Sequence, residues 1–232
     1  MIYLANDKKT ELTTENETVD TSCSEHEASK HCEELKINYK FEKTLGEVDS
    51  SKKVYLGEKI KKHTLVLDID NTLVYSEILS VSGNKTTKTE EMYELRIQIR
   101  PYAVALLETL SKLYEIVLFT AGVEEYAKDI QKRLDPKGSC ITMALGRSSC
   151  MLIKDVYYVK DLRILADRDL KDILIVDDQV VSFAFQLSNG IPIIPYIGDK
   201  NDNELLYLDK YLQSIHSAED ISEANSSYIK LC

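Results

Sequence analysis

Short, continuous apolar runs alternate with segments of helical periodicity from residue 64 to about residue 215. Apolar runs of this kind are typical of strands that are buried on both faces of a sheet. Four of them occur, at residues 64–67, 115–119, 172–176 and 191–196. Strands that alternate with helices predict an α/β fold, in which a central parallel sheet is flanked by helices.

The segments between these runs carry apolar residues three and four positions apart, as one face of a helix does. A first helix is expected to begin at Pro101, with apolar residues at positions 103, 106, 107, 110 and 113. A second is expected over residues 126–134, before Asp135-Pro136. Further helices are expected over residues 162–170, 180–187 and 203–215.

The segment from Glu77 to Arg100 interrupts the alternation of strands and helices. Polar and apolar residues alternate over residues 94–99, as in a strand with one exposed face. Ser82-Gly83-Asn84 separates this stretch from an earlier extended one. We therefore expect a β-hairpin insertion that follows the first strand and projects from the sheet.

Charge and composition divide the chain into three parts. Residues 1–50 hold 12 Asp or Glu against 6 Lys and show no lasting periodicity, which favours a disordered acidic leader. Residues 51–220 are expected to form the folded domain, and residues 221–232 a short polar tail. The net charge of the whole chain is -10, which disfavours direct binding to nucleic acid.

Nothing in the chain predicts a membrane span or an export signal. No apolar run approaches the ~20 residues that cross a bilayer, and the polar, acidic N-terminus resembles neither a signal nor a transit peptide. The five cysteines are an odd number, scattered along the chain, which suggests reduced thiols. A soluble, intracellular protein is expected, in the nucleus or the cytoplasm.

Polar residues follow several of the predicted strands at their carboxyl ends, where ligands bind in an open parallel sheet. Asp68-Ile69-Asp70-Asn71-Thr72 follows the first strand, Thr120-Ala121 the second, and Asp177-Asp178 the third, and Lys160 precedes a predicted helix. Four acids gathered at one edge repel one another unless a cation holds them. Mg²⁺, which prefers carboxylate and carbonyl oxygens, is the expected cofactor.

Five motifs in this order resemble the FCP/SCP-type phosphatases, also called the NLI-interacting-factor-like family, within the haloacid dehalogenase superfamily. They are Asp68-Ile69-Asp70-Asn71-Thr72 and the segments at residues 100–102, 117–121, 158–162 and 175–178. The resemblance covers residues 62–216, and the motifs occur in the family's order and spacing. It implies a Rossmann-like fold without a large cap domain.

The resemblance also implies roles for individual residues. Asp68 would attack phosphorus and form an aspartyl-phosphate, and Asp70 would protonate the leaving oxygen and then accept a proton from water. Thr120 and Lys160 would bind the phosphoryl group, with Thr72 and Ala121 beside them.

The metal ligands implied by the resemblance are Asp68, the Asp70 backbone carbonyl and one acid of the Asp177-Asp178 pair. The family's ligand position matches Asp178, which leaves Asp177 to position Lys160. Two residues depart from the family pattern: Asn71 stands where Glu is usual, and Asp178 where Asn is common.

The activity implied is that of an Mg²⁺-dependent protein serine/threonine phosphatase, acting on the RNA polymerase II C-terminal domain or on another phosphoprotein. The connection over residues 134–158 is too short for a large cap, and an open site suits a phosphorylated protein tail. Two alternatives stay open: a catalytically silent binding or scaffold protein of the same fold, as in mitochondrial protein import, and a small-molecule phosphatase of the superfamily. The oligomeric state and the physiological substrate are left open.

Overall fold

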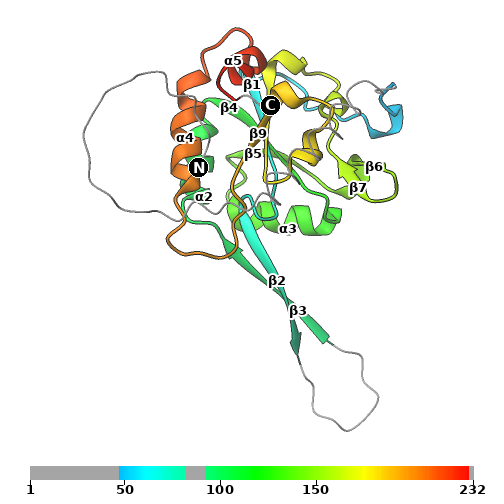
Figure 1. The fold of residues 1–232 in the computed structure, drawn as a ribbon, viewed down its shortest axis with the longest axis vertical. Coiled ribbons are helices and arrows are strands. Elements are labelled where there is room, and N and C mark those ends of the chain that lie inside the picture. The colour runs from blue at the N-terminus through cyan, green and yellow to red at the C-terminus, as the bar shows by residue number, and fades with distance from the viewer. Residues whose placement is uncertain (1–46, 82–91, 230–232) are drawn as a thin grey trace, which may run out of the picture.

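The computed structural model describes residues 47–81 and 92–229 (Figure 1). Its centre is a five-stranded sheet in the order β5-β4-β1-β8-β9, with every neighbouring pair parallel. The strands are β1 (His63–Leu67), β4 (Tyr114–Phe119), β5 (Ile141–Leu145), β8 (Ile173–Asp177) and β9 (Gly190–Pro192). The predicted α/β fold with a central parallel sheet is confirmed.

Different kinds of helix cover the two faces of the sheet. Leu65 and Leu67 of β1 point to the face on which α2 (Ala103–Leu110), α3 (Glu124–Leu134), α4 (Glu204–Ile215) and α5 (Ile221–Tyr228) pack. Val66 points to the other face, where short 3₁₀ turns close the core. The alternation along β1 is that of a strand buried on both sides.

The helices expected over residues 162–170 and 180–187 are wrong. The structure has 3₁₀ turns there: η3 (Leu162–Ile164), η4 (Leu170–Asp172), η5 (Val180–Phe183) and η6 (Leu187–Asn189). The Ile164 carbonyl accepts from the Val54 N–H at 2.7 Å, and the Ala166 N–H donates to the Val54 carbonyl at 2.9 Å. Backbone groups that a helix would use internally are thus bound by a distant segment.

Smaller corrections concern element boundaries. The first helix begins at Ala103 instead of Pro101, because Tyr102 has a φ of 69° and does not continue a helix. The last apolar run gives a strand that ends at Pro192. Two strands that lacked a clear pattern, β6 (Met151–Ile153) and β7 (Tyr157–Val159), form a short antiparallel hairpin.

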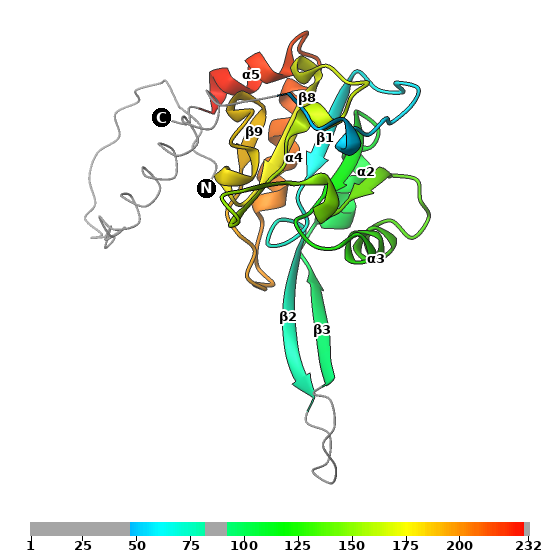
Figure 2. The same cartoon turned by 90° about the vertical axis from the view of Figure 1, so that its right-hand side faces the viewer.

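The predicted hairpin insertion is confirmed in its strands. β2 (Val74–Val81) and β3 (Met92–Ile99) pair antiparallel and extend away from the body of the molecule (Figures 1 and 2). The turn expected at residues 82–84 lies outside the described residues.

The ends of the domain differ in part from expectation. Residues 221–228 were expected to begin a polar tail, but they form α5, whose Ile221 is fully buried and whose Asn225 amide donates to the Gly190 carbonyl. Residues 1–46 of the expected acidic leader lie outside the described residues. None of the helices in the described ranges is both long and apolar enough to cross a lipid bilayer.

Candidate active site

A cavity of about 170 Å³ lies at the carboxyl edge of the sheet. The ends of β1, β4, β7 and β8 bring six of the predicted residues to its wall: Asp68, Asp70, Ala121, Lys160, Asp177 and Asp178. Residues separated by as many as 110 positions meet there because parallel strands all end at this edge.

Lys160 lies between two carboxylates of the cavity. Its ammonium donates to Asp68 Oδ1 at 2.5 Å and to Asp177 Oδ2 at 2.6 Å, and its side chain is almost fully buried. Burial alone would lower the pKa of Lys160, but the Asp177 and Asp68 carboxylates raise it above its ordinary value. Lys160 is therefore a fixed positive charge at the base of the cavity.

The acids of the cavity outnumber this one cation. Burial raises the pKa of Asp68 to about 8 despite the adjacent Lys160 ammonium, and burial together with the Asp177 charge raises that of Asp178 to about 6. Burial thus favours the neutral form of both carboxyl groups, and repulsion from the Asp177 carboxylate adds to this effect.

The donor set fits a divalent cation. Asp68, Asp177 and Asp178 each offer an oxygen within 4.8 Å of the others, and the buried Asp68 Oδ2 has no hydrogen-bond partner within the described part of the chain. A hard cation such as Mg²⁺ binds carboxylate oxygens in this arrangement and would satisfy that atom. The cluster can therefore hold a divalent metal.

The two adjacent acids differ in how their oxygens are used. Asp177 accepts from Lys160 with Oδ2 and from the Gln179 N–H with Oδ1 at 2.8 Å, so both of its oxygens are engaged. Asp178 is only partly buried and is bonded by the Asn71 side chain. Asp178 has more capacity left for a cation than Asp177, as the family resemblance implied.

Asp70 is held by two hydroxyl groups. The Thr120 hydroxyl donates to Oδ2 at 2.8 Å and Tyr126 Oη donates to Oδ1 at 2.5 Å. Ser76 on β2 bonds the Tyr126 hydroxyl in turn, at 2.8 Å. Burial and the bond to Asp70 raise the pKa of Tyr126 above its ordinary value, so the phenol stays a donor.

Tyr126 was expected only as the first residue of the helix predicted over residues 126–134, with no role in the site. The signal that could have suggested its second role is its hydroxyl, because a buried tyrosine usually bonds a polar partner. Thr120 itself is fully buried and contacts Asp70 instead of lining the cavity, so its predicted contact with phosphate stays a prediction.

Hydrogen bonds from the Arg100 side chain hold the loop that follows β1. This buried guanidinium forms two hydrogen bonds with Asp202, at 2.7 and 2.8 Å, and donates to the carbonyls of Thr72 and Ile194. Asn71 has a φ of 58°, a conformation that Asn tolerates better than most residues. The Asn that departs from the family pattern therefore suits this backbone.

Thr72, the other threonine predicted to bind phosphate, lies away from the cavity wall. Its side chain is fully buried, is absent from the cavity wall, and its Oγ1 has no partner among the described residues. The turn at Asn71 directs Asp70 to the cavity and Thr72 into the core. As for Thr120, the predicted contact of Thr72 with phosphate stays a prediction.

The parallel sheet, with an acid cluster and Lys160 in a cavity at its carboxyl edge, defines an α/β protein with a candidate site for a metal and a phosphate. The family model described as "NLI interacting factor-like phosphatase" matches residues 63–222. The chain belongs to this family.

Individual relatives agree with this assignment. The chain is 38% identical over 166 residues to "CTD small phosphatase-like protein 2" of Dictyostelium discoideum, covering 69% of this chain and 28% of that protein. It is 38% identical over 159 residues to "CTD small phosphatase-like protein 3" of Caenorhabditis elegans, covering 66% of this chain and 54% of that protein. The chain thus matches about half or less of the length of these relatives.

A solved structure has the same fold. "The Structure of Fcp1, an essential RNA polymerase II CTD phosphatase" superposes with a TM-score of 0.55, at 18% identity, covering 86% of this chain and 68% of that one. At this identity, the likeness supports the fold alone.

Proposed function

We propose that this protein is a phosphoprotein serine/threonine phosphatase that acts through a phosphoaspartate on Asp68. The observation that supports this best is the placement of Asp68: buried at the cavity wall, bonded by Lys160 through one oxygen, with its other oxygen unpartnered among the described residues. A carboxylate fixed in this way beside a lysine is arranged for attack on a phosphate.

The proposed reaction has two steps. In the first, an Asp68 oxygen forms a bond to phosphorus, the bond from phosphorus to the serine or threonine oxygen breaks, and Asp70 gives its proton to that oxygen. In the second, a water attacks phosphorus, Asp70 accepts the water's proton, and the bond to Asp68 breaks to release inorganic phosphate. Asp70 thus regains in the second step the proton that it gave in the first.

The remaining residues of the cavity position these groups. Lys160 offsets the negative charge that gathers on the phosphoryl group and on Asp68, and Asp177 fixes the lysine from its other side. Thr120 and Tyr126 orient both oxygens of Asp70. These hydrogen bonds hold the groups in place before the reaction, which favours electrostatic catalysis.

Mg²⁺ is the cation that we propose for the cluster, held by Asp68, Asp178 and the Asp70 carbonyl. Bound there, it would lower the pKa of the surrounding carboxyl groups, so that Asp68 is ionised at neutral pH, and would offset the charge of the phosphate.

The proposed substrate is a phosphorylated segment of a protein. Between α3 and β7 the chain contains only β5, η2 (Arg147–Ser149) and β6, with no separate domain that could cover the cavity. A flexible protein segment can reach such a site. Because related proteins bear CTD phosphatase names, the RNA polymerase II C-terminal domain is the first candidate to test.

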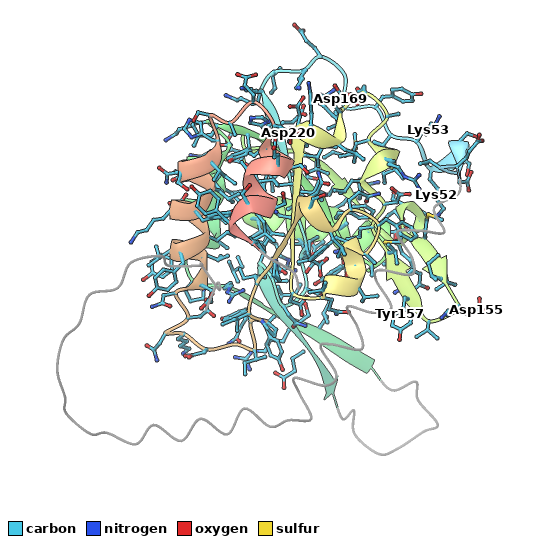
Figure 3. All side chains as sticks on the ribbon, turned by 45° about the horizontal axis from the view of Figure 1, so that its top comes forward. Lys52, Lys53, Asp155, Tyr157, Asp169 and Asp220 are labelled. Carbon is cyan, nitrogen blue, oxygen red and sulfur yellow. The ribbon has the colours of Figure 1, made fainter. Side chains whose placement is uncertain are left out.

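The test compares wild-type protein with Asp68→Asn and, as a matched control, Asp169→Asn, an exposed aspartate whose side chain makes no capping hydrogen bond (Figure 3). Phosphate release is measured from p-nitrophenyl phosphate and from a phosphoserine peptide, with Mg²⁺ or with EDTA. We expect a loss of at least about a thousandfold in Asp68→Asn, no change in the control, and loss in EDTA that added Mg²⁺ reverses.

Two results would count against the proposal. Activity retained in Asp68→Asn would exclude the phosphoaspartate. No turnover by folded, Mg²⁺-loaded wild-type protein would favour a binding protein of the same fold.

A further inference from the structure

The cavity has an apolar side that the proposed chemistry does not use. Val156, Tyr157 and Tyr158 of the β6–β7 hairpin and Val181 of η5 belong to its lining, and we call these four residues the apolar wall. Neither a phosphate nor a divalent cation gains from apolar contact. The apolar wall therefore fits another part of the substrate.

The hairpin that provides most of the apolar wall is short and well supported. Lys154 and Asp155 both have positive φ, at 54° and 56°, and the Val156 N–H donates to the Ile153 carbonyl, which is the geometry of a type I′ turn. Tyr157 packs on a small core that includes Phe185. The tip is therefore held in a tight turn above a packed base.

Two further contacts fix this hairpin relative to the acid cluster. The Arg147 guanidinium stacks over the Tyr158 ring, 5.1 Å from its centroid, and also donates to the Ala121 carbonyl at 2.7 Å. The Lys160 N–H, directly after β7, donates to the Ser182 carbonyl of η5 at 2.7 Å. These contacts connect the apolar wall to the segments that carry Ala121 and Lys160 of the cavity.

Val156 is the residue of the apolar wall that is accessible to an approaching peptide. Val156 is 66% exposed, whereas Asp68 is 5% and Asp177 1% exposed and both are bonded to Lys160. The hairpin with its labelled Asp155 and Tyr157 stands at the periphery of the molecule (Figure 3). The two turn residues, Lys154 and Asp155, have opposite charges, so the turn itself has no net charge.

We propose that the apolar wall makes the enzyme select phosphorylated segments with an apolar side chain within two residues of the phosphoserine or phosphothreonine. This rests on the proposed phosphatase function and specifies its substrate class. An apolar neighbour would cover Val156 and Tyr157 and remove their surface from water, while a polar neighbour would lose hydration there without a partner.

The experiment uses three phosphoserine peptides that differ only in the residues on both sides of the phosphoserine: leucine, asparagine or lysine. The full chain is used with Mg²⁺, and both kcat/KM and binding, by fluorescence anisotropy, are measured. We expect kcat/KM for the leucine peptide to exceed that for the asparagine peptide about tenfold, the scale of discrimination by one apolar contact.

Variants connect this preference to the apolar wall. Val156→Asn should reduce it to about twofold or less, and the conservative Val156→Leu should keep it. Ile60→Asn is the matched control, because Ile60 is also 66% exposed but lies in the segment before β1, at the opposite end of the sheet from the cavity. The Ile60→Asn variant should retain the full preference for the leucine peptide.

The outcomes separate this inference from the proposed function. Turnover with equal rates for the leucine and asparagine peptides, or fastest with lysine, would overturn the inference and leave the phosphatase intact. Tighter binding of the leucine peptide without turnover would support the apolar wall and overturn the phosphatase. If Val156→Asn leaves the preference for the leucine peptide unchanged, residues outside the apolar wall cause that preference, and the inference is wrong.

Discussion

A basic residue is buried beside acidic residues at each end of the central sheet. The basic and acidic charges are paired at the amino end, whereas the acids outnumber the basic residue at the carboxyl end. At the amino end, the Arg168 guanidinium donates to both oxygens of Glu115, at 2.8 Å each, and Thr64 donates to the same carboxylate. At the carboxyl end, Lys160 is shared by Asp68 and Asp177, with Asp178 beside them.

The difference indicates which end is built for stability and which for chemistry. Both oxygens of Glu115 have partners, and Arg168 uses its remaining donors on the carbonyls of Gly57 and Asp167. At the other end, Asp68 keeps an oxygen without a partner among the described residues, and burial there raises carboxyl pKa values. An ion pair whose carboxylate oxygens all have partners cannot bind a further ligand. A carboxylate that keeps an unpartnered oxygen beside other acids can bind a cation.

The largest effect that separates the two ends is expected for Lys160→Met. Loss of its charge should lower kcat on p-nitrophenyl phosphate by about a hundred- to a thousandfold, because no other basic side chain among the described residues contacts Asp68. Lys171→Met, at an exposed lysine, is the control and should retain wild-type kcat. Retention of more than about a tenth of the activity in Lys160→Met would exclude an essential role.

At the amino end, Arg168→Met should reduce stability and leave the chemistry intact. It leaves Glu115 buried and uncompensated, so the free energy of unfolding should fall by about 3–5 kcal/mol, as measured in urea. The double variant Arg168→Met/Glu115→Leu should recover most of that loss. Activity per folded molecule should stay within about twofold in both, and a large drop in kcat would show that this end also acts on the site.

A smaller change is expected for Tyr126→Phe, which removes one of the two hydroxyls that hold Asp70. The loss of one such bond is worth about 1 to 1.5 kcal/mol, so kcat should fall by about tenfold. Because Tyr126 acts through Asp70, its loss should shift the pH profile of kcat while the KM for p-nitrophenyl phosphate changes little. If Tyr126→Phe changes neither kcat nor its pH profile, Tyr126 contributes to packing alone.

The smallest effect concerns His63, at the start of β1. Burial lowers the pKa of His63, and its Nε2 bonds the Ala218 carbonyl at 2.9 Å. The unfolded chain therefore takes up a proton first as the pH falls, so the stability is complete above pH ~6.5 and is lost as the pH falls towards the lowered pKa of the folded state.

His63→Phe removes this titration. Denaturant unfolding at pH 7 and pH 5 should show a shallower loss of stability in the variant than in wild-type protein, by at most about 1.4 kcal/mol for each unit of pKa lowering. Equal losses in the two proteins would mean that His63 does not contribute.

The sequence predicted the parts of the molecule whose patterns are local. The buried strands β1, β4 and β8 each contain a continuous apolar run, and the residues that follow them include Asp68, Asp70, Asp177 and Asp178. Because parallel strands end at one edge, these positions were enough to expect a common site. Lys160 was assigned by resemblance, since nothing in its own surroundings distinguishes it from a surface lysine.

Other features depended on contacts between distant segments. Residues 162–170 have a helical spacing of apolar residues, yet Val54 binds the backbone at Ile164 and Ala166, so a 3₁₀ turn forms instead. The apolar wall arises in the same way, because β6 and β7 are too short for their pattern to be recognised and are held by packing around Phe185.

The sequence by itself determined the buried strands β1, β4 and β8, the family and the acids of the cavity, because apolar periodicity and strand ends are properties of neighbouring residues. Only the tertiary structure decided that Tyr126 holds Asp70 and that the Thr72 side chain is buried away from the cavity. These outcomes depend on side-chain direction and on hydrogen bonds between residues far apart in the chain, which are fixed when the whole domain packs.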